Sequence, residues 1–211
     1  MATQSSTSSR AEKARATREH LIATAIDVVR QRTYGAATMF EVAKAAGVTP
    51  GALQHHFGSR AMLMFAILQT ILEATDENAI PWPDASLPLQ PRAAAYLDAL
   101  WTRLYEPARF LAAWSVYFGA ADESALQPRI ADMRHELSAS LHARFAQVFP
   151  EAAQRTDLPA FVDMVLSTLR GMGVVRLFGT QPQAEAAQRA QLAIVIATWC
   201  RSAPPIHKET P

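Results

Sequence analysis

The chain has 211 residues, of which 50% are hydrophobic and 18% are charged, so it can hold one large core or a small module joined to a larger one. Its formal net charge is only +1, as expected for an ordinary globular protein. Residues 1–60, however, hold eight Lys and Arg against four Asp and Glu, whereas residues 61–211 hold twelve against fifteen. The basic character is therefore confined to the N-terminal part of the chain.

The sequence shows neither the pattern of a secretory signal peptide nor that of a membrane-spanning segment. The opening MATQSSTSSR lacks the apolar segment of a secretory signal, and the single cysteine, Cys200, leaves no intramolecular disulfide. The longest uninterrupted apolar stretches, such as residues 192–200, fall short of the ~18 to 20 residues that cross a bilayer. We expect a cytoplasmic protein with no membrane span.

The hydrophobic pattern predicts an all-α fold. Apolar residues of the first helix recur at spacings of three and four, and no segment alternates with period two. Four prolines predict a loop over residues 79–90, and further breaks are expected at 106–107, 122–128, 150–159 and 179–182. About nine helices result. Residues 1–10 and 202–211 read as disordered tails, and they flank two helical parts of the chain, residues 11–60 and 61–201.

Residues 38–60 have the pattern of a helix-turn-helix. Thr38 and Glu41 form a capping box, in which the hydroxyl of Thr38 accepts from the amide three residues on and Glu41 reaches back. Gly47 lies where a helix ends in the left-handed conformation, Thr49 caps the next helix and Pro50 takes its first position. A turn of about three residues therefore joins two short helices.

The second of these helices has little to bury beyond Leu53 and Phe57, so its other face is free for a DNA groove. Gly51 and Ala52 keep its N-terminal end thin, and Ser59 caps a following helix whose Arg60 can pair with a phosphate. The residues expected to contact DNA are Thr38, Met39, Thr49, Pro50, Gly51, Ala52, Gln54, His55, His56 and Arg60.

Residues 16–68, with the Tyr34-Gly35 turn, Thr38, the VAKAAGVT segment and the LQHHFGSRAML segment, resemble the DNA-binding domain of the tetracycline-repressor (TetR) family of transcriptional regulators. The resemblance implies that Thr38 contacts the DNA backbone, that residues 49–56 form the recognition helix, and that Arg60 replaces a phosphate-binding lysine. The family commonly has tyrosine where this chain has Gln54, so Gln54 is expected to bond a phosphate or a base edge instead.

For residues 80–211 the resemblance implies only a helical body that binds an effector and dimerises. We therefore expect a DNA-binding domain over residues 11–60 and a helical effector-binding and dimerisation domain over residues 61–201. Aromatic residues recur along its helices, and they fill either a core or a chamber for a small hydrophobic or aromatic effector. The candidate effector residues are Tyr96, Trp101, Tyr105, Trp114, Phe118, Met133 and Arg170.

The helices expected over residues 158–179 and 182–200 are more apolar than burial on one side requires, and the first contains the interior glycines Gly171 and Gly173. They predict a homodimeric four-helix bundle, or, alternatively, a core within one protomer. The candidate dimer residues are Phe161, Val165, Leu169, Gly173, Leu177, Leu192, Val195 and Trp199.

No pattern of catalytic or metal-binding residues emerges. The side chains of His55 and His56 point about 100° apart on a helix, and His135 and His142 are separated by two turns, so neither pair suits a metal. Cys200 ends an apolar helix, where a buried inert thiol is expected. We expect neither an enzyme nor a cofactor.

The sequence thus predicts a homodimeric regulator, most simply a repressor, that binds a near-palindromic DNA operator and is released by a small effector. The basic arm of Arg10, Lys13, Arg15 and Arg18 adds DNA contacts or is only a solvated surface. Two alternatives stay open: an activator of the same fold, and a dimeric small-molecule-binding or scaffold protein without specific DNA binding.

Overall fold

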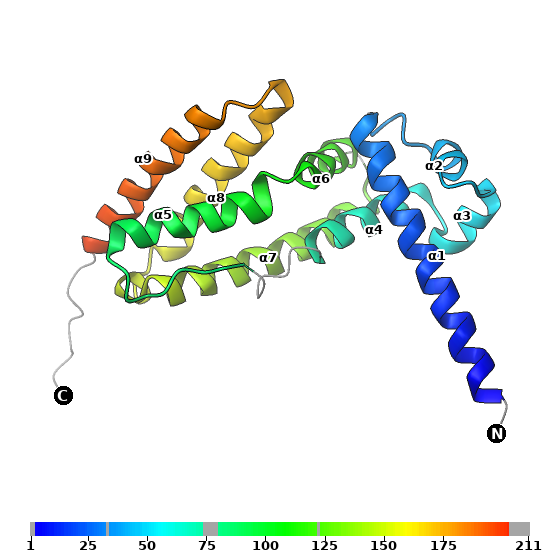
Figure 1. Cartoon of the computed structure of the whole chain (residues 1–211), viewed down its shortest axis with the longest axis horizontal. Helices are drawn as coiled ribbons and strands as arrows, with labels where there is room; N and C mark the ends of the chain where they lie inside the picture. The colour runs from blue at the N-terminus through cyan, green and yellow to red at the C-terminus, as the bar shows by residue number, and fades with distance from the viewer. Residues whose placement is uncertain (1–2, 33, 74–79, 122, 203–211) are drawn as a thin grey trace. The chain divides into compact units, whose positions relative to one another are not determined.

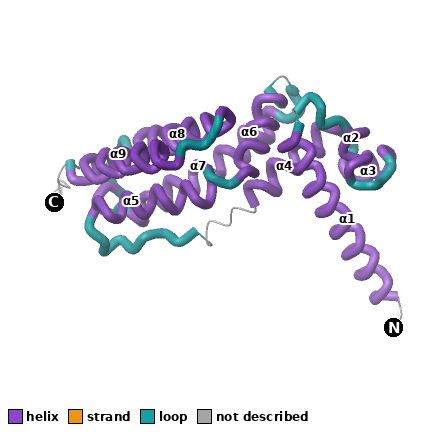
Figure 2. The backbone as a smooth tube through the Cα atoms, turned by 45° about the horizontal axis from the view of Figure 1, so that its top comes forward, coloured by secondary structure: helices purple, strands orange, loops and turns teal. Residues whose placement is uncertain are grey.

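The structure, a computed structural model, describes residues 3–32, 34–73, 80–121 and 123–202, and over these residues it has nine α-helices and no strand (Figures 1 and 2). The all-α prediction is therefore confirmed. The chain divides into two compact units. We call them the head unit, Met1–Ala74 with Ala108–Ile130, and the body unit, Thr75–Pro107 with Ala131–Pro211.

The head unit contains α1 (Thr3–Gln31), α2 (Met39–Ala45), α3 (Pro50–Phe57), α4 (Arg60–Glu73) and α6 (Ala108–Gly119). α1 packs against α2, α4 and α6, and α3 packs against α2 and α4 (Figure 1). The core of the head unit includes Leu21, Ala25, Val29, Val42, Ala43, Leu53, Leu63, Met64, Ile67, Leu68 and Val116. Because α4 and α6 share this core, the head unit extends beyond the domain expected over residues 11–60.

The helix α1 begins at Thr3, whereas the sequence predicted a disordered tail over residues 1–10. Two physical reasons account for the difference. Residues 3–31 contain no proline or glycine, and serine and threonine cost only a few tenths of a kcal/mol each in a helix. The buried C-terminal half of α1 also supplies the helix nucleus, so extension toward the N-terminus needs no second nucleation.

The body unit contains α5 (Leu89–Leu100), a π-helix (Trp101–Tyr105), most of α7 (Gln127–Val148), α8 (Leu158–Val175) and α9 (Pro182–Arg201). Short 3₁₀ turns lie at Pro150–Ala152 and Arg176–Phe178. α9 packs against α5 and α8. The body core includes Tyr96, Leu97, Leu100, Phe145, Phe149, Val162, Val165, Leu169, Ile196 and Ala197.

The breaks between the helices follow the prolines and glycines as expected. Residues 80–88 of the loop predicted over 79–90 form no helix, and residue 79 lies outside the described residues. α6 begins directly after Pro107, α8 carries Pro159 in its first turn, and Gly179 at φ 122° precedes α9. Of the predicted C-terminal tail, residues 203–211 lie outside the described residues.

One arginine is buried in the body unit. Arg92 of α5 is 4% exposed, and its Nε donates to the carbonyl of Leu87 at 2.8 Å. Its terminal nitrogens donate to the carbonyl of Val148 and to both carboxylate oxygens of Glu151, each at 3.0 Å. The guanidinium therefore joins the loop before α5 to the end of α7 and the turn that follows it.

The segment Leu158–Phe178 is the one described helix that is long and apolar enough, by length and composition alone, to cross a membrane. In this structure Phe161, Val165 and Leu169 on one side of it are buried in the body unit, and Asp163 and Thr168 on the other side are exposed. The segment therefore has the burial pattern of a core helix.

Candidate nucleic-acid interface

The helix-turn-helix forms as its capping residues predict. The hydroxyl of Thr38 accepts from the amide of Glu41 at 3.2 Å, and the hydroxyl of Thr49 accepts from the amide of Ala52 at 3.1 Å. Gly47 has φ 68°, so the chain can turn sharply between α2 and α3 at a position where a side chain would be strained. Each short helix is thus started by a threonine.

One half of the expected capping box is absent. The side chain of Glu41 does not reach back to the amide of Thr38 but pairs with Arg32, one residue after α1 ends. An ion pair with a cation is stronger than a hydrogen bond to a neutral amide, so the carboxylate turns toward Arg32. This pair ties the end of α1 to the first turn of α2.

α3 buries one narrow side and exposes the rest. Leu53 is fully buried and Phe57 is 7% exposed, whereas Thr49, Pro50, Gly51, Ala52, Gln54 and His55 are exposed and His56 is half-buried. The rings of His55 and His56 lie edge to face, with centroids 5.8 Å apart. The outward side of α3 therefore presents hydrogen-bonding groups and a thin N-terminal end, and Thr38 and Met39 lie close to the protein surface at the start of α2.

Nothing inside the protein requires a glycine at position 51. A Cβ added there would meet only the Oγ1 of Thr49, at an ordinary 3.9 Å, and the backbone of Gly51 is helical. Gly51 therefore leaves the exposed N-terminal end of α3 without a side chain, which suits the close approach of an external surface.

The basic arm is helical. Lys13, Arg15 and Arg18 are exposed on α1, and Arg15 forms an exposed pair with Glu19 at 3.7 Å. The guanidinium of Arg18 lies 5.2 Å from the ring centroid of Phe57, beside the C-terminal end of α3. The side chain of Arg10 lies outside the described residues. Part of the basic surface is therefore held next to α3 by contacts within the head unit.

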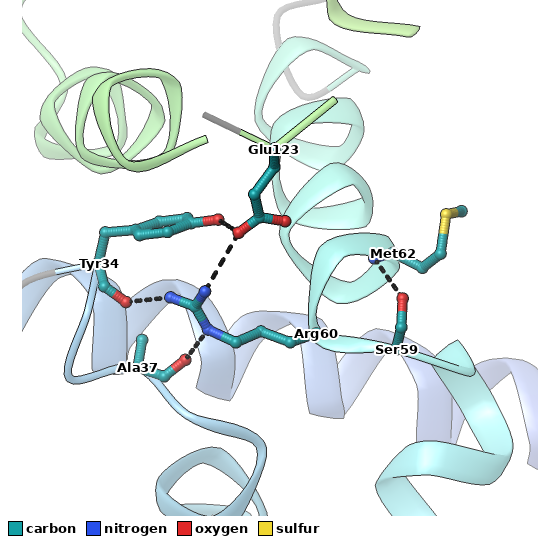
Figure 3. Close-up of polar contacts among 6 residues, drawn as sticks. All are labelled: Tyr34, Ala37, Ser59, Arg60, Met62 and Glu123. Carbon is teal, nitrogen blue, oxygen red and sulfur yellow. Dashed lines mark hydrogen bonds and ion pairs between the residues drawn. The ribbon is translucent and has the colours of Figure 1, made fainter. Parts of the chain in front are cut away.

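Arg60 is placed differently from the other predicted DNA contacts (Figure 3). Its Nε donates to the carbonyl of Ala37 at 3.2 Å, and its terminal nitrogens donate to the carbonyl of Tyr34 and to the carboxylate of Glu123. The side chain is 29% exposed. The guanidinium of Arg60 is therefore already bound to other residues of the head unit, and a phosphate could bind it only if these contacts were broken.

The candidate effector residues are divided between the two units. Tyr96 and Trp101 are buried in the body unit, where Tyr96 packs against Trp82, Phe145 and Phe149 and Trp101 packs against Tyr105. Met133 and Arg170 are half-buried there. Trp114 and Phe118 belong to α6 of the head unit, and Phe118 is 62% exposed. Sequence reasoning missed Trp82, Phe145 and Phe149 as the partners of Tyr96, because they come from other elements.

The candidate dimer residues divide by exposure. Phe161, Val165, Leu169, Gly173 and Leu192 are buried within one protomer, Trp199 is half-buried, and Leu177 and Val195 are 52% and 44% exposed. Other apolar residues of α8, α9 and the turn between them are exposed instead: Met164, Val175, Phe178 and Ile194. The expected helices form, and of the predicted dimer residues Leu177 and Val195 belong to the exposed apolar set.

A serine, a histidine and an aspartate meet in the body unit without the geometry of a catalytic triad. Both the Oγ of Ser138, at 3.4 Å, and the Oδ1 of Asp163, at 2.8 Å, contact the same nitrogen, Nε2 of His142. A triad needs the acid and the nucleophile on opposite ring nitrogens, so this cluster has no path for a proton from serine through the ring. Cys200 is free and buried, and burial raises the pKa of its thiol to about 12.

Comparison with known proteins agrees with this geometry. The family described as bacterial regulatory proteins, tetR family, matches residues 21–67, from α1 to α4. The HTH-type transcriptional regulator BetI of Rhizobium meliloti (strain 1021) is 27% identical over 107 residues, which are 51% of this chain and 53% of BetI. The match thus spans about half the length of this relative. The family and BetI are transcriptional regulators and not enzymes, as the sequence predicts.

Solved structures share the fold over most of the chain. A transcriptional regulator from Rhodococcus sp. Rha1 superposes with a TM-score of 0.70 at 19% identity, covering 89% of this chain and 99% of that one. The multidrug binding protein EbrR, solved with imidazole, superposes with a TM-score of 0.63 at 23% identity, covering 85% and 93% of the two chains. The helix-turn-helix region of this chain thus matches the tetR family of bacterial regulatory proteins, and the fold of these structures extends over most of the chain.

Proposed function

We propose that the chain is a ligand-responsive transcriptional repressor that binds a near-palindromic operator as a homodimer. The observation that carries the proposal is the exposed side of α3, where Gln54 and His55 stand free of the interior beside a Gly51 that no internal contact requires. A helix of this kind can enter a major groove and read base edges. Two subunits would place their α3 helices about 34 to 36 Å apart, one turn of duplex.

The proposed DNA contacts divide by chemistry. Gln54, His55 and His56 carry the hydrogen-bonding groups that discriminate bases, while Thr38, Met39, Thr49 and Pro50 lie at helix starts that suit the DNA backbone. Gly51 and Ala52 permit close approach. Lys13, Arg15 and Arg18 add positive charge along α1, which is expected to raise affinity for any duplex at low salt.

The proposed dimer forms through the exposed stripe of α8 and α9. Met164, Val175, Leu177, Phe178, Ile194 and Val195 are exposed apolar residues of these helices and of the turn between them. A Cβ added at Gly171 would meet no atom within 4 Å beyond its own turn of helix, so the packing of one chain gives no reason for a glycine there. Close packing against a partner helix would give one.

Light scattering tests the dimer. Val195→Asp places a charge in the proposed interface and is expected to give a monomer at micromolar concentration. Leu87→Asp, at an apolar residue of similar exposure in the loop before α5, is the control and should stay a dimer. A wild-type monomer, or equal masses for the two variants, would reject this interface.

The proposed effector is a small hydrophobic or aromatic molecule that binds the body unit. EbrR, which shares the fold, is a multidrug binding protein solved with imidazole and with ethidium. The body unit offers the matching chemistry, because rings of Trp82, Tyr96, Trp101 and Tyr105 gather on or next to α5. An effector releases DNA only by binding the DNA-free state more tightly, and a shift from 1:99 to 99:1 needs a preference of about 10⁴-fold.

DNA selection from a random duplex pool tests the function directly. The protein is expected to enrich a near-palindrome, and fluorescence anisotropy should then show weaker binding for Gln54→Ala and His55→Ala, by about tenfold for each lost base contact of 1 to 3 kcal/mol. Gln69→Ala, at an exposed glutamine of α4, is the matched control and should bind as the wild type does. No enrichment, or equal affinities for Gln54→Ala and Gln69→Ala, would contradict the proposal.

The place of the selected site relative to the promoter then separates repressor from activator. A site that overlaps the promoter supports repression, and a site upstream of it supports the activator alternative. A cytoplasmic location follows from either role, because the DNA lies there.

A further inference from the structure

Four residues meet where α1, α4 and α6 of the head unit come together, and we call them the Arg60 cluster: Tyr34, Arg60, Gly119 and Glu123 (Figure 3). They lie up to 89 positions apart in the sequence. The guanidinium of Arg60 lies 4.1 Å from the centroid of the Tyr34 ring and 3.3 Å from the carboxylate of Glu123. The Tyr34 hydroxyl donates to the same carboxylate oxygen.

The charge of Arg60 is therefore already balanced by Glu123. A phosphate approaching the guanidinium would meet a neutral ion pair, and the stack on Tyr34 covers one face of the guanidinium. Burial, together with the hydrogen bond to Glu123, raises the pKa of Tyr34 to about 12, so its hydroxyl remains a donor at neutral pH. The donors and the charge of Arg60 are thus already used within the head unit, whereas a phosphate site needs an unpaired cation.

Gly119, the last residue of α6, makes the stack possible. The Tyr34 ring lies directly against it, and a Cβ at this position would overlap the ring atoms. The end of α6 and the Glu123 turn that follows it are therefore both fastened to the turn between α1 and α2.

The cluster also holds both ends of the helix-turn-helix. Arg60 binds the carbonyls of Tyr34 and Ala37, directly before Thr38 caps α2. Arg60 itself follows Ser59, whose hydroxyl accepts from the amide of Met62 at 3.2 Å directly after α3 ends at Phe57. A shift of the Glu123 turn would thus act on the segments immediately before α2 and after α3.

The chain gives this turn a route to the body unit. Residues 108–130 belong to the head unit, but the body unit continues the chain at both of their ends. The chain thus enters the body unit both before α6 and within α7, on either side of the Glu123 turn.

We propose that Arg60 is a positioning residue, not a phosphate ligand, and that its pairing with Glu123 holds α3 in the orientation that binds the operator. This inference rests on the proposed function. It adds a regulatory contact, because any change in the body unit that pulls Glu123 away would lower operator affinity without touching the DNA-facing side chains.

The sign of one charge change separates the two roles. Glu123→Gln removes a negative charge and frees Arg60, so a phosphate role predicts tighter DNA binding. The positioning role predicts the reverse: a dissociation constant raised about fivefold or more, as for a typical coupling between sites. Asp27→Asn, which removes an exposed carboxylate of α1 outside the cluster, is the matched control and should bind at least as tightly as the wild type.

The salt dependence gives a second readout. Arg60→Gln should weaken binding to the selected duplex while leaving the slope of log affinity against log salt unchanged, whereas loss of a phosphate contact would flatten it by about one unit. The double variant Arg60→Gln/Glu123→Gln should be no weaker than the weaker single variant, because both changes break the same contact. Gly119→Ala should also weaken binding with every charge in place.

Hydrogen exchange shows whether the variants act through α2 and α3. In Glu123→Gln and Gly119→Ala the amides of residues 38–60 should lose protection while those of α9 keep theirs. Tighter DNA binding by Glu123→Gln, a slope reduced by one in Arg60→Gln, or unchanged protection of residues 38–60 would overturn the inference. If the wild type selects no DNA, the proposed function fails, and the exchange measurement still decides whether the cluster orders the helix-turn-helix.

Discussion

Replacing Arg92 or its partner Glu151 should destabilise the protein by unequal amounts. Arg92 is 4% exposed, so Arg92→Met leaves the buried carbonyl of Val148 without its donor, at about 1 to 3 kcal/mol, and strands the carboxylate of Glu151. The Glu151 side chain is 39% exposed and can be rehydrated, so we expect a total of about 3 kcal/mol, the low end for a broken buried pair. Glu151→Gln keeps an acceptor oxygen and should cost about 1 kcal/mol.

Urea unfolding followed by circular dichroism measures the free energy of unfolding of both variants, at one protein concentration because the stability of the proposed dimer would depend on it. Arg30→Met breaks an exposed pair with Asp27 at 3.2 Å and is the control, with an expected change below about 1 kcal/mol. If Glu151→Gln lowered the free energy of unfolding as much as Arg92→Met does, the reasoning would be refuted. The stabilisation would then come from the charge pair and not from the hydrogen bonds that the buried guanidinium donates.

Three further outcomes follow from the structure. Thr49→Ala removes the hydroxyl that caps α3 and should lower the stability of the head unit by about 1 kcal/mol, seen as faster hydrogen exchange in α3. Thr24→Ala is the control and should change the stability little, because the hydroxyl of Thr24 donates only to the carbonyl of His20 within α1. Cys200 should resist alkylation at neutral pH until the chain unfolds, because its thiol is buried and its pKa is raised; rapid labelling of the native protein would contradict this. The hydrogen bond from Arg155 lowers the pKa of Asp157 to about 2. The stability that the Asp157 carboxylate contributes is therefore complete above about pH 4 and is lost as the pH falls through 2. The urea midpoints of wild type and Asp157→Asn should accordingly converge as the pH is lowered from about 4 to 2.

The local features of the head unit could be predicted because they depend on neighbours in sequence. The hydroxyls of Thr38 and Thr49 cap helices through amides three residues away, and Gly47 ends α2 through its own backbone. The exposure of Gln54 and His55 likewise follows from a short helix with only two buried positions. These elements need no knowledge of the rest of the fold.

Contacts between distant segments could not be predicted. The direction of Arg60 depends on Glu123, 63 positions later, and a pattern of local spacing holds no information about such a pair. Glu41 similarly prefers Arg32 over the amide of Thr38. In α8 and α9 the apolar residues cover more than one side, so periodicity alone could not tell the stripe that faces the protomer core, with Leu169, from the stripe that includes Val195.

The head unit is assembled from two separated pieces of chain, and this limits how it can be transplanted. A chimera cut after residue 74 would carry α1 to α4 without α6, leaving the apolar sides of α1 and α4 unmatched and Tyr34 without Gly119 and Glu123. A graft onto a foreign sensor would therefore need residues 108–130 as well, with junctions at Pro107 and inside α7. Exchanging α3 alone between relatives should therefore disturb the fold far less than exchanging the whole N-terminal part.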